Sequence, residues 1–203
     1  MTTKRIRKTG DERREEIKEG ILDIIFSEGM HKLSTRYLAQ KVGVSEGALF
    51  RHYPSKKAMI EDILEDVNAQ MVSGLKNIAE SDKSPVLRLE EYITFTLNYL
   101  LHKKGITLLM FTEASYKNDE GLKQTLNSIY KSQKKYFAKI VSAGINEGIW
   151  DKSIDIENLS RLYMGIPVTL NIEMILNPEN FDHSAFCDNM KMIFLKMLSI
   201  SQT

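Results

Sequence analysis

The chain has 203 residues, of which 42% are hydrophobic and 27% charged, a balance typical of globular proteins that can bury a core. No apolar run approaches the roughly 20 residues that cross a bilayer, and no apolar stretch follows the basic N-terminal residues, so neither a membrane span nor a signal peptide is expected. The single cysteine, Cys187, excludes an internal disulfide, and we expect a cytoplasmic protein.

Charge is distributed unevenly along the chain. The net charge is +1, but residues 1–57 contain thirteen basic and eight acidic residues, which gives +5 there and −4 in the remainder. A basic front on a nearly neutral chain is typical of a module that binds a polyanion. A solvated tail before an ordinary helix would give the same count.

Helical periodicity of apolar residues runs through almost every segment, and the alternation typical of strands is missing, which predicts an all-α fold. About nine helices are expected, in chain order over residues 11–28, 34–42, 45–52, 55–79, 85–102, 106–116, 120–146, 155–176 and 182–200. The three short helices at the front predict a helix-turn-helix domain over residues 1–57. The remaining residues, 58–203, predict a larger helical domain for ligand binding and dimerisation.

The stretch from Leu33 to Lys57, LSTRYLAQKVGVSEGALFRHYPSKK, contains the signals of a helix-turn-helix. Ser34 and Ser45 can each cap the start of a short helix, and Gly43 suits the positive φ of a tight turn between the two helices. In a helix-turn-helix the second helix enters the major groove of DNA by its N-terminal half. The stretch therefore predicts a DNA-binding module.

Five residues of the second helix are candidates to face DNA. Gly47 lowers helix stability by about 1 kcal/mol relative to Ala, and close approach to a DNA backbone is one reason to accept that cost. Ala48 can touch a thymine methyl group, and Arg51 and His52 can donate to bases or phosphates. Glu46 can accept from cytosine N4 or repel wrong partners.

Basic residues on either side extend this expectation. Lys56 and Lys57 lie in the first turn of the next helix, where a cation opposes the helix dipole. A DNA phosphate would resolve that conflict, whereas lysines that simply point into solvent are the alternative. The N-terminal arm either lies along an adjacent groove or is a solubilising tail; its cations are Lys4, Arg5, Arg7 and Lys8.

Residues 11–60 resemble the N-terminal DNA-binding domain of the TetR (tetracycline repressor) family. The resemblance is carried without a gap by ILDIIFSEG, Ile21–Gly29, and by LSTRYLAQKVGVSEGALFRHYPSKKAM, Leu33–Met59. It implies phosphate contacts near Thr35 and Tyr53 and from Lys56. It implies base or backbone contacts from Arg36, Ser45, Gly47, Ala48, Arg51 and His52. Phe50 stands where the family usually has tyrosine, and beyond about residue 65 the resemblance is only architectural.

The last two predicted helices have wide apolar stripes. In TetR-like proteins these helices pair across a twofold axis, and a dimer matches the half-sites of a palindromic operator. We therefore expect a homodimer, although the same stripes could simply complete the core. The residues expected at the interface are Leu159, Ile166, Leu170, Met174, Phe186, Met190, Ile193, Phe194 and Met197.

The aromatic and polar residues of the body are sufficient to line an apolar cavity. Each aromatic residue at helical spacing is also explained by core packing alone. The residues expected to line a pocket for a small hydrophobic or amphipathic effector are Phe95, Tyr99, His102, Met110, Phe111, Glu113, Phe137, Tyr163 and Asn171.

No pattern of an enzyme stands out. The four histidines lack metal-ligand spacing, and no phosphate loop, nucleophile elbow or dinucleotide motif occurs, so no activity, metal or cofactor is expected. The expected function is a sequence-specific transcriptional regulator, a repressor that binds operator DNA as a homodimer and is released by an effector. An effector-free helical DNA-binding or adaptor protein remains the alternative.

Overall fold

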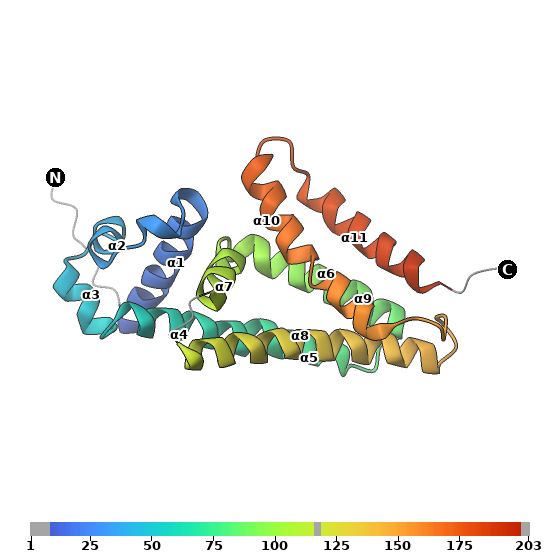
Figure 1. Ribbon diagram of the computed structural model, residues 1–203. Coiled ribbons are helices and arrows are strands. Elements are labelled where there is room, and N and C mark those ends of the chain that lie inside the picture. Colours follow the sequence, from blue (N-terminus) through green and yellow to red (C-terminus); the bar gives the residue numbers. More distant parts are fainter. Residues whose placement is uncertain (1–8, 116–118, 200–203) are drawn as a thin grey trace.

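The computed structural model describes residues 9–115 and 119–199, and these residues form helices and connecting loops with no strand (Figure 1). The elements are α1 (Gly10–Glu28), the 3-10 turn η1 (Met30–Lys32), α2 (Thr35–Lys41), α3 (Glu46–His52), α4 (Lys56–Asp66), the π-helical segment η2 (Val67–Val72), α5 (Ser73–Ala79), α6 (Pro85–His102), α7 (Ile106–Ser115), α8 (Glu120–Asn146), α9 (Ile156–Tyr163), α10 (Ile166–Leu176) and α11 (His183–Leu198).

The predicted all-α fold is confirmed. Because α4, η2 and α5 follow one another directly, and only Met164 and Gly165 separate α9 from α10, the described residues form nine helical rods. The helix expected over residues 155–176 is divided into α9 and α10, and Pro167 stands in the first turn of α10. Tyr116, the expected end of the sixth helix, lies outside the described residues.

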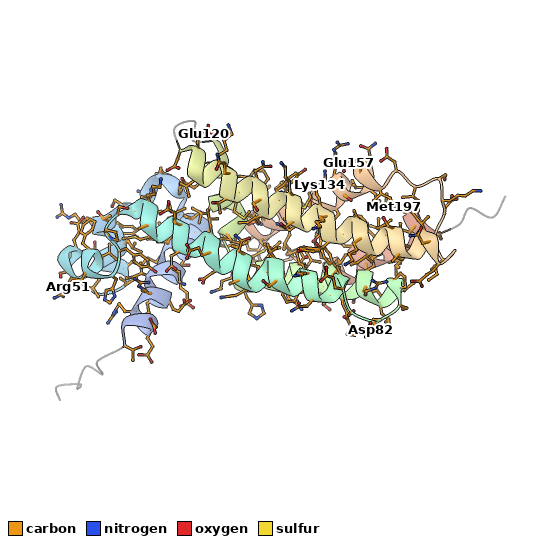
Figure 2. The ribbon with its side chains drawn as sticks, turned by 90° about the horizontal axis from the view of Figure 1, so that it is seen from below. Arg51, Asp82, Glu120, Lys134, Glu157 and Met197 are labelled. Carbon is orange, nitrogen blue, oxygen red and sulfur yellow. The ribbon has the colours of Figure 1, made fainter. Side chains whose placement is uncertain are left out.

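The helices form two connected parts (Figure 1). The short helices α1–α3 gather at one end of an elongated body, in which α4–η2–α5 and α8 run side by side along its length (Figure 2). Helix α6 packs on α5, α8 and α11, while α7 lies between α1 and the body and packs on α1, α8 and α10. Helix α7 therefore belongs structurally to both parts.

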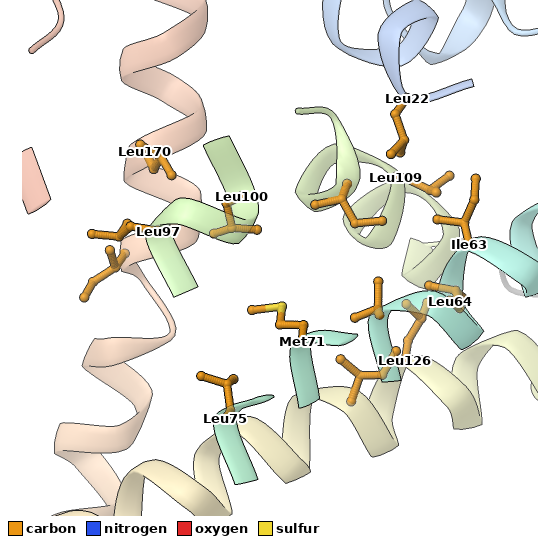
Figure 3. Close-up of a cluster of buried hydrophobic side chains, with 14 of the residues drawn as sticks. Leu22, Ile63, Leu64, Met71, Leu75, Leu97, Leu100, Leu109, Leu126 and Leu170 are labelled. Atoms are coloured by element: carbon orange, nitrogen blue, oxygen red, sulfur yellow. The ribbon is translucent and has the colours of Figure 1, made fainter. Parts of the chain in front are cut away.

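One continuous apolar core joins the two parts. Leu22 of α1, Ile63 of α4 and Leu109 of α7 are buried close to one another where the parts meet (Figure 3). The boundary expected between residues 57 and 58 falls inside α4, which starts at Lys56 and continues into the body. A division into two domains at this position remains a proposal.

None of the described helices combines the length and apolar character that crossing a bilayer requires. Within residues 9–115 and 119–199, no group of three or more His, Cys, Asp or Glu side chains is arranged to hold a metal ion.

Candidate functional site

The turn between α2 and α3 has the local geometry that its sequence predicts. The Ser34 hydroxyl accepts from the Tyr37 backbone N–H at 3.2 Å, and the Ser45 hydroxyl accepts from the Ala48 N–H at 3.1 Å. Gly43 has a φ of 69°, a conformation that costs glycine little. Both caps satisfy backbone donors that the helix itself leaves free, so α3 is fixed at the end of the molecule by local interactions.

The outer side of this end carries cations without partners. Arg36 of α2 and Arg51 of α3 are exposed, and among the described residues neither has a carboxylate within ion-pairing distance. Arg51 projects from the free end of the molecule (Figure 2). A Cβ added at Gly47 would meet nothing within 4 Å, so no contact within the described chain requires glycine at this position of α3.

Thr35 and Glu46 are paired with each other across the turn. The Thr35 hydroxyl donates to the Glu46 carboxylate and so connects the first turn of α2 with the first turn of α3. Both residues are expected from the sequence to contact DNA. The structure shows that they also hold the two helices together.

Tyr53 differs from the sequence-based expectation. It is only 2% exposed, and its hydroxyl donates to Asp62, so it cannot reach a phosphate in this arrangement. Burial, followed by the hydrogen bond to Asp62, raises the pKa of Tyr53. The guanidinium of Arg14 lies over the ring at 5.2 Å and also donates to the His52 carbonyl at 3.4 Å. Tyr53 therefore joins α3 to α1 and α4.

The two lysines at the start of α4 have different surroundings. The Lys56 ammonium donates to the Leu33 carbonyl at 3.4 Å, and its charge acts on Glu113 of α7. Burial raises the pKa of Glu113, and Lys56 partly opposes that rise. Lys57 pairs with Asp119, the residue that caps α8, at 2.6 Å. Both lysines thus link the α2–α3 end to the body, which the sequence did not predict.

A buried lysine also holds α1 against α4. Lys18 is 5% exposed and pairs with Glu15 at 2.6 Å, with Asp62 at 3.7 Å and with Asp66. Burial lowers the pKa of Lys18, but hydrogen bonds to Asp66 and Glu15 outweigh it, so that the pKa is raised. The sequence does not reveal this cluster because Lys18 and Asp66 are 48 positions apart in the chain.

A cavity of about 590 Å³ lies between α7 and α8. Its volume is within the range of about 300–1,000 Å³ typical of small-molecule sites. Three separate helical segments contribute lining residues, among them Met71 of η2, Leu100 of α6 and Leu126 of α8 (Figure 3). The described residues that line it are Met71, Leu100, Ile106, Thr107, Met110, Phe111, Glu120, Lys123, Gln124, Leu126, Asn127, Tyr130, Gln133, Met164 and Pro167.

Of the nine residues expected to line a pocket, Met110 and Phe111 line this cavity. Phe137 and Tyr163 instead stack on each other in the core, with ring centroids 4.5 Å apart.

The other five have separate surroundings. The Phe95 ring lies against Gly74, and burial raises the pKa of Tyr99 to about 12. A ring nitrogen of the exposed His102 is 2.7 Å from the Asn98 carbonyl. The Asn171 amide donates to the Pro167 carbonyl at 2.8 Å. Glu113 is buried beside Lys56, as described above.

Most residues expected at a dimer interface are buried within the single chain. Leu159, Ile166, Leu170, Met174 and Phe194 are each at most 7% exposed. Phe186 and Met190 are half-buried, and only Ile193 and Met197 are largely exposed, at 42% and 45%. The opposite side of the late helices is apolar and exposed, at Leu162, Ile172, Ile175 and Leu176.

The N-terminal arm with Lys4, Arg5, Arg7 and Lys8 lies outside the described residues. Its placement along a neighbouring groove, or as a solubilising tail, therefore stays a prediction.

Sequence comparison finds that the front of the chain is similar to a known family. Residues 19–63 match the profile of bacterial regulatory proteins of the tetR family. The nucleoid occlusion factor SlmA of Aliivibrio fischeri (strain MJ11) is 32% identical over 130 residues, which are 64% of this chain and 66% of SlmA. The chain thus spans just under two thirds of the length of this relative.

Structural comparison extends the similarity to nearly the whole chain. The ketosteroid transcriptional regulator KstR2 of Mycobacterium tuberculosis superposes with a TM-score of 0.79 at 18% identity, covering 93% of this chain and 96% of that one. The transcriptional regulator FadR of Bacillus subtilis, solved with stearoyl-CoA, gives 0.70 at 16% identity, covering 89% and 97%. These similarities show the fold. The proteins named here are regulators and a nucleoid occlusion factor, and none is named as an enzyme.

Proposed function

We propose that this chain belongs to the TetR family of bacterial regulatory proteins, whose profile residues 19–63 match, and that it is a sequence-specific DNA-binding transcriptional regulator. It acts in the cytoplasm as a repressor that binds a palindromic operator as a homodimer and is released by a small hydrophobic or amphipathic effector. It is not an enzyme and needs no metal or cofactor.

One observation supports DNA binding above all others, namely the exposed surface of α3 with Arg51, which has no ion-pair partner among the described residues. Capping by Ser45 fixes the helix, and Arg51 extends from the end of the molecule (Figure 2). Gly47 leaves the helix backbone open to a partner. A helix presented in this way can enter the major groove by its N-terminal half. Further contacts to bases and phosphates are proposed for residues at the same end of the molecule, namely Arg36, Ala48, His52 and Lys56.

The proposed dimer surface consists of exposed apolar residues of the late helices. Ile172, Ile175 and Leu176 on α10, with Ile193 and Met197 on α11, remain between 42% and 71% exposed in one protomer. A second protomer related by a twofold axis would cover them and align two copies of α3 with two half-sites. Sedimentation at micromolar concentration tests this proposal, because a monomer there would contradict it.

The cavity supports an effector role because α7 lines it and also packs on α1 of the helix-turn-helix part. Met110 and Phe111 of α7 line the cavity, while Leu109 of the same helix is buried near Leu22 of α1 (Figure 3). Gly105, directly before α7, has a φ of 85° and lies so close to Leu22 that a Cβ would be 2.4 Å from its carbonyl oxygen. A displacement of α7 by a ligand would therefore act on α1.

A ligand changes DNA affinity only if it binds the DNA-competent and incompetent arrangements unequally. The ion pair between Lys57 and Asp119 is a second connection, since Asp119 caps α8 directly before Glu120 of the cavity lining. FadR, whose fold is similar, was solved with the amphipathic ligand stearoyl-CoA, which supports an effector of this general kind.

The decisive experiment is selection of bound DNA from a random pool. We expect a palindromic sequence to be enriched, and Arg51→Ala to lose that preference, with Arg161→Ala at the opposite end as the matched control. Enrichment without any palindrome would contradict the dimeric regulator. Enrichment that Arg51→Ala does not alter would contradict the role of α3.

A second candidate is an effector-free DNA-binding or adaptor protein, favoured by the 32% identity to SlmA, which is named as a nucleoid occlusion factor. The two candidates differ in one measurable property. A regulator with an effector loses DNA affinity when the cavity is filled, whereas an effector-free protein does not.

A further inference from the structure

Gln133 interrupts the apolar stripe of α8. Its neighbours on the same side of the helix, Ile129 and Phe137, are fully buried, and Gln133 itself is only 4% exposed. The Tyr92 hydroxyl donates to the Gln133 backbone carbonyl at 2.7 Å. The helix backbone is therefore held in place at this residue, although its polar side chain lies where an apolar one would be expected.

The side-chain oxygen of Gln133 has no hydrogen-bond partner among the described residues. A buried amide without a partner destabilises a protein because its lost hydration is not replaced, and such groups in native structures call for an explanation. The other described case, Nε of Arg88, belongs to a guanidinium that donates to the Ala79 carbonyl at 3.0 Å and does not line the cavity. Gln133 does line it.

The shape of the cavity limits what can reach Gln133. Its α8 wall extends from Glu120 to Gln133, which corresponds to about 20 Å at 1.5 Å per residue. Met164 and Pro167, from the junction of α9 with α10, add apolar lining opposite this wall. The α8 wall is therefore long: most of its lining residues from Glu120 to Tyr130 are exposed, and it ends at the buried amide of Gln133.

Among the described lining residues, charge is confined to the Glu120 end. Lys123 is the only cation of this described lining, and it is exposed and 3.8 Å from Glu120. The described lining therefore offers no cation at the Gln133 end to compensate an ionised carboxylate, whose burial without a partner is costly. A neutral polar group is consequently the one that this end accommodates.

We propose that Gln133 is the polar anchor of the cavity, and that the ligand is an elongated lipid-like molecule with a hydroxyl group at its buried end. The hydroxyl donates to the Gln133 side-chain oxygen and can accept in turn from its amide nitrogen. The apolar chain then runs along α8 past Leu126 towards Glu120. This inference rests on the proposed role of the cavity as the effector site.

The test compares two probes that differ in one hydrogen-bond donor, 1-decanol and decyl methyl ether. Binding is followed by the ligand-induced shift of the thermal midpoint, from which dissociation constants are obtained. We expect the wild-type protein to bind the alcohol about tenfold more tightly, because the ether leaves the Gln133 oxygen unpartnered. Gln133→Leu should remove this preference, and Gln124→Leu, at the exposed rim of the same cavity, should retain it.

Equal affinity of the wild-type protein for both probes would overturn the assignment of Gln133. A preference that persists in Gln133→Leu would overturn it as well. Gln133→Leu places an apolar residue on an apolar stripe, so its fold is expected to persist, and its unfolding transition without probe provides the check.

Release of the selected DNA by 1-decanol, measured in parallel, separates this inference from the proposed function. Release without discrimination between the probes overturns only the role of Gln133. Discrimination without release supports the anchor and overturns the effector role of the cavity.

Discussion

The α2–α3 end and the cavity both contain polar groups without a partner among the described residues, but these groups are exposed in the first region and buried in the second. At the α2–α3 end, Arg36 and Arg51 are exposed and have no ion-pair partner among the described residues. In the cavity, Gln133 is buried and its side-chain oxygen has no partner. An exposed cation costs little without a partner because water solvates it, whereas a buried amide does not have that option. The first region therefore suits a large polyanion that approaches from outside, and the second suits a small molecule that enters.

The two regions also differ in how they are built. The α2–α3 end is one continuous segment whose caps act over three residues, whereas the cavity collects residues from η2, α6, α7, α8 and the junction of α9 with α10. Between them lie α7 and the ion pairs of Lys18 and Lys57. Substitutions in the α2–α3 end and in the contacts that join it to the body should separate the two regions, and Lys18 should have the largest effect.

Lys18→Met should destabilise the fold most, because it leaves Asp62 and Asp66 facing each other without their cation. Loss of one partner from a buried ion pair typically costs about 3–5 kcal/mol. Since both carboxylate side chains are about a quarter exposed to solvent, we expect the free energy of unfolding to fall by about 2–3 kcal/mol, at or below the lower end of that range. Urea unfolding measures it, with the exposed Lys152→Met as control. An unchanged midpoint would show that the cluster does not connect the two regions.

Arg51→Ala should weaken binding to the preferred DNA sequence by about 1–3 kcal/mol, the range for a direct base contact, and leave other sequences nearly unaffected. Ligand binding in the cavity should not change, because Arg51 lies at one end of the molecule (Figure 2) and is not among the described residues that line the cavity. Titration of matched and scrambled duplexes at one salt concentration measures the effect. Equal loss on both duplexes would assign Arg51 to the DNA backbone instead.

Tyr53→Phe should change the response of stability to alkaline pH. The folded-state pKa of Tyr53 is raised, chiefly by burial, so its contribution is fully present below the unfolded pKa of about 10 and is lost as the pH rises above that value. Phenylalanine cannot ionise, so the slope of unfolding free energy above pH 10 should decrease by about 1.4 kcal/mol per pH unit. Denaturant titrations at a series of pH values between about 9 and 11 measure this slope. An identical slope in both proteins would contradict the buried position of Tyr53.

Gly47→Ala should have the smallest effect on stability, and with the opposite sign. An alanine inside a helix is favoured over glycine by about 1 kcal/mol or less, and space exists for the added Cβ. The unfolding midpoint should rise while DNA affinity falls, because the methyl group holds the helix away from the DNA. The exposed Gly121→Ala on α8 serves as a control that leaves DNA affinity unchanged. A variant of Gly47 that is more stable and binds DNA equally well would remove the argument for close approach.

Several features of the site could be read from the sequence, and others could not. The caps of Ser34 and Ser45 and the turn at Gly43 depend on residues within three positions, so the pattern was sufficient. The buried position of Tyr53 was not visible, because it depends on Asp62 in the next helix. Gln133 could have been found from its place on the apolar stripe of α8, where a polar residue is the exception.

The interface residues illustrate a different limit. Both Leu170 and Ile172 lie on α10, but one is 1% and the other 50% exposed. An apolar helix presents enough hydrophobic residues for two stripes, and periodicity alone does not say which stripe faces the chain's own core. The interface residues expected from the sequence lie on the buried stripe of α10, whereas the proposed dimer interface consists of the exposed stripe.

The amino-acid sequence alone determined the helical class, the helix ends and the geometry of α2–α3, since periodicity, capping and turn conformation are local properties. Tertiary packing alone decided which residues surround the cavity, which apolar stripe stays exposed and where α7 joins the two parts. Those features depend on how separate helices meet, and contacts between helices distant in the chain leave no regular spacing in the sequence.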